Sequence, residues 1–238
     1  MAMKPISLSA KMMENADEAV LSGNFSAALE NCYISDLGGL TRFPRLKTVV
    51  RLPKTEQVYL YPKAFRGDLH AVCSGHVFRV NVDAPASQDM TSFVVQGGKR
   101  PTFAETTDEL VIAAGGAITA LRKETTSRLS ATAPDTTHIG YIDGYLVAME
   151  LNSGRFLHSP VDDLEGEWNP LDIFSAEGNP DNIVALQVTK FNELLLCGTQ
   201  STEQFDSAPE GSSPFFRRWV MDTGVHKPAA YTLTFADK

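Results

Sequence analysis

The chain has 238 residues, of which 43% are hydrophobic and 21% are charged. This composition is typical of a globular protein and excludes a disordered or fibrous chain, while the length allows one large core or two small ones. The 21 basic and 29 acidic residues give a formal charge of −8. That charge argues against a protein whose whole surface binds a phosphate backbone, because such a surface is basic.

The cysteines and the hydropathy indicate a reducing compartment. Cys32, Cys73 and Cys197 lie far apart and form no CxxC pair, so neither a disulfide framework nor a zinc site is indicated. Two of them stand in apolar runs, where buried, reduced thiols are expected. The N-terminus has no apolar core of signal-peptide length, and no run is long enough to span a membrane. We therefore expect a protein that is made in, and soluble in, a cytoplasm.

The first segment differs in composition from the rest of the chain. The apolar spacing of residues 1–30 fits neither a helix nor a strand, so we expect residues 1–27 to form an N-terminal arm that is partly extended, with a short helix over residues 15–21 or 26–29 as the alternative. From residue 28 onward, β-type runs and turns dominate. Cys32–Ile34 and Leu40–Phe43 are expected to be a strand pair, and Gln57–Tyr61 alternates as a half-buried strand does.

A repeated unit begins after Gln57. Each copy has a polar corner, an apolar strand, a turn of small residues and a second strand. The corner residues are Asp68, Asp108, Asp143, Asn192 and Asp237, separated by 40, 35, 49 and 45 residues. The second strands are expected at Val77–Val82, Ala117–Leu121, Arg155–Ser159 and Glu203–Asp206. A period of about 40 to 45 residues with several short strands is typical of a β-propeller blade.

The repeat predicts an all-β fold, a β-propeller-like array of about four to five blades of short antiparallel strands, occupying residues 28–238. The segment from Gln57 to Lys238 has 182 residues, which suffices for about four blades, and the fifth corner is followed by one residue only. The array is therefore expected to be incomplete at its C-terminal end. Three alternatives stay open: a small ring, a ring completed by Asn31–Arg45, or part of a longer propeller.

Catalytic and metal-binding motifs are absent from the sequence, which contains no GxSxG, HExxH, P-loop or helix-opening GxGxxG pattern. We predict no catalytic residue, no cofactor and no metal. The acidic cluster Asp162, Asp163, Glu165 and Glu167 favours a solvated loop, and the alternatives are a cation site and a carboxylate pair that acts on a glycan. The five histidines are isolated, and Gly97-Gly98-Lys99-Arg100 is interpreted as a hairpin loop rather than an anion-binding turn.

One segment interleaves aromatic and basic side chains, as protein interfaces do and as single-stranded nucleic acid sites also do. The negative net charge favours the protein interface. Three arginines of the early strands are added as candidate contacts. The predicted interface residues are Phe215, Phe216, Arg217, Arg218 and Trp219 with Arg42, Arg45 and Arg51.

The order of residues between Tyr141 and Gly224 resembles the packaged-DNA stabilisation proteins of short-tailed bacteriophages, which are tail hub proteins. The resemblance is carried by an ordered set of short pieces rather than by one motif. These are Asp143-Gly144-Tyr145, Phe156–Ser159, Phe174–Asp181, Gly198 with Ser201-Thr202-Glu203, Pro214-Phe215, Gly224 and, more weakly, Asn31…Gly39…Arg42-Phe43-Pro44. Arg45 stands where the family usually has Gly, so the local turn there is expected to differ.

The resemblance implies a non-enzymatic structural component of the phage virion, located in the tail and made in the host cytoplasm. It implies a hexameric ring that binds the portal-adaptor protein and a tail needle or fibre, with DNA as passing cargo. An acidic channel lining would let DNA slide without sticking. Two rival functions stay open, a glycan hydrolase that uses the 162–167 loop and a host-encoded propeller that binds proteins.

Overall fold

A computed structural model describes residues 48–176, 178, 181–208 and 214–233, together with the backbone of Cys32–Ile34 and Leu40–Arg42. The chain divides into two units, Met1–Thr48 and Val49–Lys238. In the first unit, β1 (Cys32–Ile34) pairs antiparallel with β2 (Leu40–Arg42), as predicted. The arm over residues 1–27 lies outside the described residues, and its boundary with the propeller stays a prediction.

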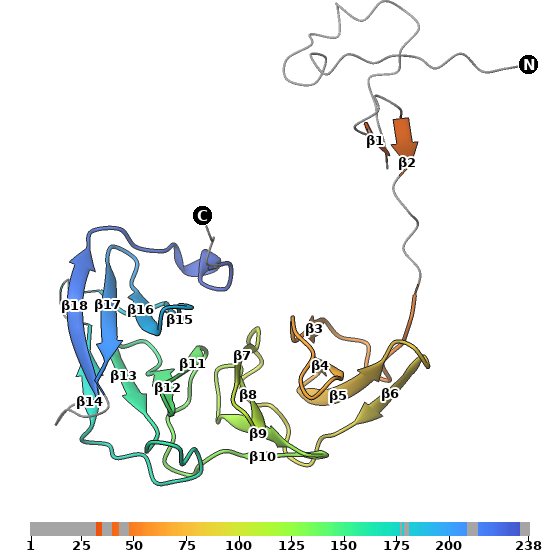
Figure 1. The fold of residues 1–238 in the computed structure, drawn as a ribbon, viewed down its shortest axis with the longest axis horizontal. Coiled ribbons are helices and arrows are strands. Elements are labelled where there is room, and N and C mark those ends of the chain that lie inside the picture. The colour runs from red at the N-terminus through yellow and green to blue at the C-terminus, as the bar shows by residue number, and fades with distance from the viewer. Residues whose placement is uncertain are drawn as a thin grey trace, which may run out of the picture. The chain divides into compact units, whose positions relative to one another are not determined.

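The second unit consists of four antiparallel four-stranded sheets, each built from strands that are consecutive in the chain. Figure 1 shows them following one another in an open arc, with the first and fourth sheets at its two ends. The first sheet contains β3 (Val58–Leu60), β4 (Leu69–Cys73), β5 (His76–Asn81) and β6 (Ala86–Asp89). The second contains β7 (Thr102–Glu105), β8 (Glu109–Ala113), β9 (Thr119–Arg122) and β10 (Thr125–Arg128).

The third sheet contains β11 (Ile139–Ile142), β12 (Tyr145–Met149), β13 (Arg155–His158) and β14 (Ile173–Ser175). The fourth contains β15 (Ala185–Val188), β16 (Glu193–Cys197), β17 (Thr202–Ser207) and β18 (Phe215–Met221). The propeller-like, all-β fold is thereby confirmed. Within the described part of the chain, the one helical element is the 3-10 helix Lys227–Ala229, and no helix is long and apolar enough to cross a membrane.

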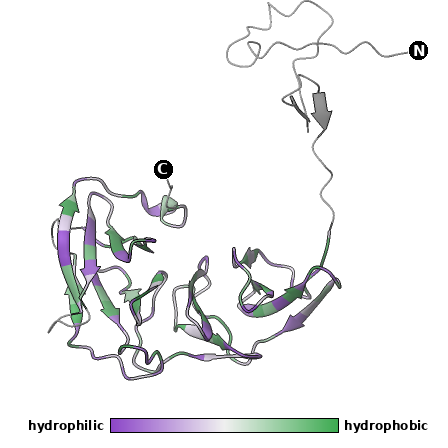
Figure 2. Ribbon diagram, in the orientation of Figure 1, coloured by the Kyte–Doolittle hydropathy of each residue, from purple (hydrophilic) through white to green (hydrophobic). Residues whose placement is uncertain are grey.

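In the first three sheets the second strand is the most deeply buried, because a strand that is covered on both faces has to be apolar on both. All five residues of β12 are buried, and in β8 the four residues after Glu109 are buried. Both strands are apolar runs apart from Glu109 at the start of β8. Figure 2 shows where hydrophobic and hydrophilic residues lie along the ribbon. The sequence predicts that the apolar runs Leu110–Ala114 and Leu194–Cys197 are buried on both faces. The first run is buried throughout, whereas Leu195 in the second is only half-buried.

The polar corners connect the first and second strands of each sheet, but they are built in two ways. Asp143 and Gly144 have φ values of 46° and 84° and form a two-residue turn, and Arg66-Gly67 does the same in the first sheet. In the second sheet the hydroxyl of Thr106 accepts the backbone N–H groups of Asp108 and Glu109 instead. The corners therefore recur in position while their turn chemistry differs.

Three apolar cores lie between successive sheets. Val72 and Val77 pack on Leu110 and Ile112 between the first and second sheets. Trp168 lies in the core that joins the second and third sheets. The third core is aromatic and joins the third sheet to the fourth through Phe156, Phe205 and Phe215, among others. Since each sheet buries its faces on its neighbours, the sheets stabilise one another in chain order.

The face of the fourth sheet that points away from the third sheet is partly covered by residues 222–233, which we call the C-terminal strap. Val225, Ala230 and Leu233 of the strap pack around Ala185 and Cys197. Backbone and side-chain bonds fix it in place: Val225 N–H donates to the Gly198 carbonyl at 2.8 Å, and the Thr202 hydroxyl donates to the Thr223 carbonyl at 2.6 Å. The fifth predicted corner, Asp237, lies outside the described residues.

Candidate interaction surface

The strand β18 forms the outer edge of the fourth sheet and carries most of the predicted interface residues. Its first residue is buried and the next six are exposed. Phe216, Trp219 and Met221 expose 49%, 40% and 44% of their surface. Figure 2 shows the strand as hydrophobic towards both ends with a hydrophilic middle. An exposed edge strand with large apolar side chains is a site at which another polypeptide can bind.

The pairing register places these three side chains on one face. Phe216, Trp219 and Met221 stand opposite Asp206, Gln204 and Thr202 of β17. Phe205, between Gln204 and Asp206, belongs to the core shared with the third sheet. Because directly opposite residues share a face and neighbours alternate, the three exposed side chains point away from the third sheet. The strap covers the inner strands of this face and leaves β18 uncovered.

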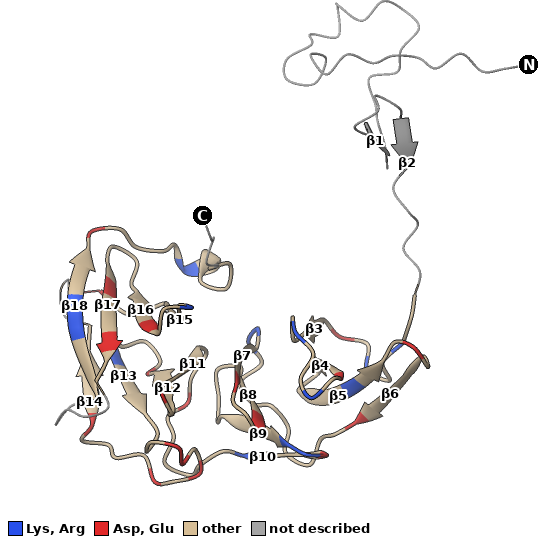
Figure 3. Ribbon diagram, viewed as in Figure 1, with Lys and Arg blue, Asp and Glu red and all other residues tan. Residues whose placement is uncertain are grey.

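Arg217 and Arg218 are paired with acids of their own sheet. Arg218 donates to Asp206 at 2.6 Å, and Arg217 lies 3.4 Å from the carboxylate of Glu203. Figure 3 shows the basic middle of β18 beside acidic residues of β17. Burial would raise the pKa of Asp206, but hydrogen bonds from Arg218 and Gln204 and the charge of Arg218 outweigh it, so that this pKa lies below its ordinary value.

Glu203 is the most buried acid of this surface, with 1% exposure. It accepts the Gly178 backbone N–H at 2.6 Å on one oxygen and faces Arg217 with the other. A buried carboxylate needs such partners, because leaving it unpaired would cost several kcal/mol, on the order of 3 to 5. Glu203 and Arg217 therefore act together to hold β18 and Gly178 in place, a role that the sequence pattern did not indicate.

Phe215 is buried, with 2% exposure, and serves the chain's own core. Its ring lies 5.5 Å from Phe174 and 5.7 Å from Tyr145, both in edge-on geometry. It is therefore not available on the surface of this chain, although it precedes the exposed Phe216 by one residue. The alternation of a strand accounts for the difference between the two.

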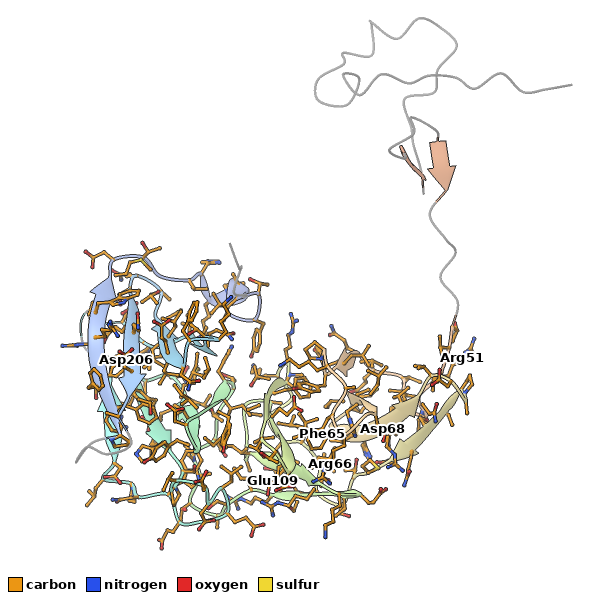
Figure 4. The ribbon with its side chains drawn as sticks, viewed as in Figure 1. Arg51, Phe65, Arg66, Asp68, Glu109 and Asp206 are labelled. Carbon is orange, nitrogen blue, oxygen red and sulfur yellow. The ribbon has the colours of Figure 1, made fainter. Side chains whose placement is uncertain are left out.

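Of the three early arginines, Arg51 is the one whose position relative to β18 is described. Arg51 is exposed beside the first sheet, whereas Asp206, the partner of Arg218, lies on the fourth sheet at the other end of the array (Figure 4). The backbone of Arg42 ends β2, its side chain is not described, and Arg45 lies outside the described residues. A contact role for these three residues stays a prediction.

The inner strands surround a cavity of about 840 Å³. Its lining contains three charged residues, Lys63, Arg100 and Glu105, and also the ring of His138. Tyr61 donates a hydrogen bond of 2.5 Å to Glu105, and burial together with this acid raises the Tyr61 pKa. The cavity of this propeller unit is thus not acidic. The acidic channel that we expected concerns the axis of an assembled ring, and it stays a prediction.

Three residues of the strap, Ala230, Tyr231 and Leu233, form part of the lining of this cavity. The Tyr231 ring stacks on His138 with a centroid separation of 4.7 Å, and the Arg100 guanidinium lies 5.7 Å from the centre of the same ring. Burial lowers the pKa of His138 to about 4, although a backbone hydrogen bond with Ala230 opposes the shift. His138 is therefore a neutral, buried ring at pH 7.

The four acidic residues of the 162–167 loop do not come together as a metal-binding or catalytic site. Glu165 is ion-paired with Arg122, and Asp163 accepts the Gly166 backbone N–H at 2.9 Å. None of the four carboxylates of this loop lines the cavity, and among the described residues no group of three or more metal-binding side chains is found. Leu164 and Trp168 anchor the loop in the core between the second and third sheets. The solvated-loop interpretation accounts for these contacts.

Comparison with solved structures shows propellers of low identity. Virginiamycin B lyase from Staphylococcus aureus, as an inactive variant with quinupristin, is 13% identical with a TM-score of 0.52, covering 78% of this chain and 61% of that one. A Lactobacillus plantarum protein is 14% identical with a TM-score of 0.47, covering 82% and 65%. The chain thus spans less than two thirds of these proteins, and the likeness to the lyase shows the fold alone.

A search of curated proteins found no match. A family model does match: the phage stabilisation family, described as the bacteriophage P22 Gp10 β-propeller, over residues 63–235. The match includes most of the four sheets, the segments Asp143–Tyr145 and Phe174–Asp181, and β18. Since this covers well over half of the chain, and the sheets have the arrangement of a propeller, the chain belongs to the bacteriophage P22 Gp10 β-propeller family of phage structural proteins and is a virion component.

Proposed function

We propose that this protein is a tail hub component that binds below the portal-adaptor ring and helps to retain packaged DNA. Membership of the phage stabilisation family is the observation that carries the proposal. The protein acts through shape and contacts rather than turnover. It is made in the host cytoplasm and becomes part of the virion tail, where a hexameric ring meets the adaptor on one side and a needle or fibre on the other. DNA passes as cargo.

The exposed face of β18 supports a contact role within this assembly. Phe216, Trp219 and Met221 are large apolar side chains on one face of an edge strand, and 40% or more of each is exposed. Aromatic and Met side chains are enriched in protein interfaces, and charged groups are depleted from their centres. Asp206 stands on this face opposite Phe216 and balances the charge of Arg218, which lowers the cost of burying this face against a partner.

The experiment is to assemble phage particles with Trp219→Ala, Phe216→Ala or Leu171→Ala. Leu171 is the matched control, an apolar side chain that is 86% exposed on the turn before β14. Loss of an aromatic anchor at an interface costs about 2 kcal/mol or more, so the two β18 variants should assemble poorly or lose DNA while the control behaves as the parent. Normal DNA retention by both β18 variants would contradict this assignment.

Assembly can be tested separately from DNA retention. The mass of the purified protein, alone and mixed with the portal-adaptor protein, measures ring formation and adaptor binding directly. We expect the protein to form a ring either by itself or after the portal-adaptor protein has been added. A chain that remains a monomer in both samples would contradict the hub function, whatever the β18 variants do.

A further inference from the structure

The cavity between the inner strands has a positively charged lining, although the chain as a whole carries a formal charge of −8. Lys63 and Arg100 are its two cations and Glu105 is its one acid, which gives the lining a net charge of +1. Glu105 accepts the Tyr61 hydroxyl. Neither cation forms an ion pair or a side-chain hydrogen bond with a residue that the structure describes. Both are therefore available to a ligand.

The guanidinium group of Arg100 is held in position by a ring of the strap. It lies 5.7 Å from the centre of the Tyr231 ring, and that ring stacks on His138 with a centroid separation of 4.7 Å. A guanidinium group that contacts an aromatic face keeps its N–H groups free, and their forked arrangement matches the two oxygens of a carboxylate. Arg100 is thus a pre-positioned donor in the wall of the cavity.

Aromatic rings from four parts of the chain contribute to the rest of the lining. They are Tyr59 and Tyr61 of the first sheet, Phe103 of β7, Tyr141 of β11 and Tyr231 of the strap. The side-chain carbonyl of Gln57 accepts the Tyr59 hydroxyl at 3.0 Å, which leaves the amide NH₂ group of Gln57 as a donor. Volumes of about 300 to 1,000 Å³ and apolar walls with a few polar groups are typical of small-molecule sites. The volume of about 840 Å³ falls within this range.

The charge and the rings together indicate the class of ligand. A nucleic-acid strand carries a charge on every phosphate and is bound along a track of basic side chains, which a lining with a net charge of +1 does not supply. A neutral ligand would take Arg100 out of water without giving its charge a partner, which is unfavourable. One carboxylate attached to an aromatic body satisfies both the charge and the rings.

We propose that the cavity binds a small aromatic carboxylate, with the carboxylate paired to Arg100 and the aromatic body packed among the tyrosine rings. Aromatic rings attract one another in offset and edge-on arrangements, and the several rings of the lining allow either. Lys63 adds a second positive charge, which draws the anion towards the cavity. This inference goes beyond the proposed role in the phage tail and does not rest on it.

The test is a titration of the full chain with 2-naphthoate, followed by ligand-detected NMR. The matched probe is 2-naphthamide, which has the same ring system and no charge. We expect 2-naphthoate to bind about tenfold more tightly than the amide, because a hydrogen bond between two charged groups is stronger than one to a neutral group. Equal affinities of the two probes, or no binding of 2-naphthoate at millimolar concentrations, would overturn the proposal.

Two variants locate the binding. Arg100→Gln should weaken the binding of 2-naphthoate about tenfold or more and leave that of the amide unchanged. Lys54→Gln removes the same charge from an exposed residue outside the lining, and should bind both probes as the parent does. Thermal unfolding midpoints establish that both variants are folded. Equal weakening in the two variants would show that net charge rather than contact with Arg100 controls binding, and the proposal would be wrong.

A single-stranded oligothymidine tests the nucleic-acid alternative. We expect it not to displace 2-naphthoate from the parent. If it does so at lower concentrations than 2-naphthoate itself requires, and Arg100→Gln abolishes this effect, the cavity is a nucleic-acid site and the proposal fails. None of these measurements needs a ring or the adaptor protein, so their outcome is separate from that of the assembly experiments.

Discussion

Asn192 donates a hydrogen bond from its side-chain amide to the carboxylate of Asp143 at 2.7 Å, across 49 residues of sequence. These are the corner residues of the fourth and third sheets. Arg66 makes the corresponding link in the first half of the array, donating to the backbone carbonyl and the carboxylate of Asp108 at 3.0 and 3.2 Å. The corners that define the sequence repeat thus also tie neighbouring sheets together.

The Asp143–Asn192 bond should give a measurable coupling energy. Both residues have positive φ, so glycine is the substitution that removes each side chain without backbone strain. In a double-mutant cycle of Asp143→Gly and Asn192→Gly, we expect a coupling of about 0.5 to 1 kcal/mol in the free energy of unfolding, because the pair is exposed. Strictly additive effects would show that the bond adds no stability.

Any side chain at position 140 should lower the free energy of unfolding, because Gly140 has no room for a Cβ atom. A Cβ atom there would lie within 2.8 Å of Leu186 and Val188, so Gly140→Ala should force β11 and β15 apart and cost about 1 to 3 kcal/mol. Gly154→Ala is the control, since its nearest contact would be 3.4 Å away. Chemical denaturation of both variants measures the difference, and equal midpoints would contradict the close packing of the inner strands.

Asp181 should be the main support of the turn between β16 and β17. Its carboxylate accepts the Gln200 N–H at 2.7 Å and both the N–H and the hydroxyl of Ser201. Asp181→Ala leaves these donors without partners and should lower the free energy of unfolding by about 1 to 3 kcal/mol. Asp172→Ala, at an exposed turn position, should change it little. An Asp181 variant as stable as the parent would refute this assignment.

His138 should make stability depend on pH. Its pKa is about 4 in the folded chain, against 6.5 as the ordinary value. Between these values the unfolded chain binds a proton that the folded chain does not, so the free energy of unfolding falls as the pH drops from 6.5 towards 4. We expect a loss of about 2 to 3 kcal/mol from this residue.

The control is His138→Phe, which keeps an aromatic ring beside Tyr231 and removes the titration. Burial also lowers the pKa of His70, so the variant should retain part of the acid sensitivity. The quantity to compare is the difference between the two unfolding curves across this pH range. An unchanged pH profile in His138→Phe would mean that other groups control the acid response.

The blade repeat could be predicted because each buried second strand is an apolar run followed by a small-residue turn. The outer strands carry no such signal. Ala86–Asp89 and Thr125–Arg128 are largely polar, and their backbone pairing to a neighbour defines them as strands. Edge positions of this kind face solvent on one side, so the sequence need not be apolar there.

The contact role of the β18 segment stays a prediction, and the sequence pattern that indicated this segment does not give its detailed geometry. Aromatic and basic residues marked the segment of β18, yet the partners of Arg217 and Arg218 lie on β17 and depend on the pairing register. That register shifts at Arg218, which has no opposite residue in β17. A β-bulge of this kind cannot be inferred from alternation alone, and it decides which side chains point outward.

The internal pairing of the two β18 arginines affects how this surface responds to its surroundings. A virion passes from a crowded cytoplasm to dilute media, and attraction between exposed charges weakens or strengthens with the ionic strength at each stage. Glu203 and Asp206 neutralise the guanidinium groups within the sheet. A joint formed by the remaining apolar side chains would draw its strength from removing carbon surface from water, and charge screening by concentrated salt would therefore not weaken it.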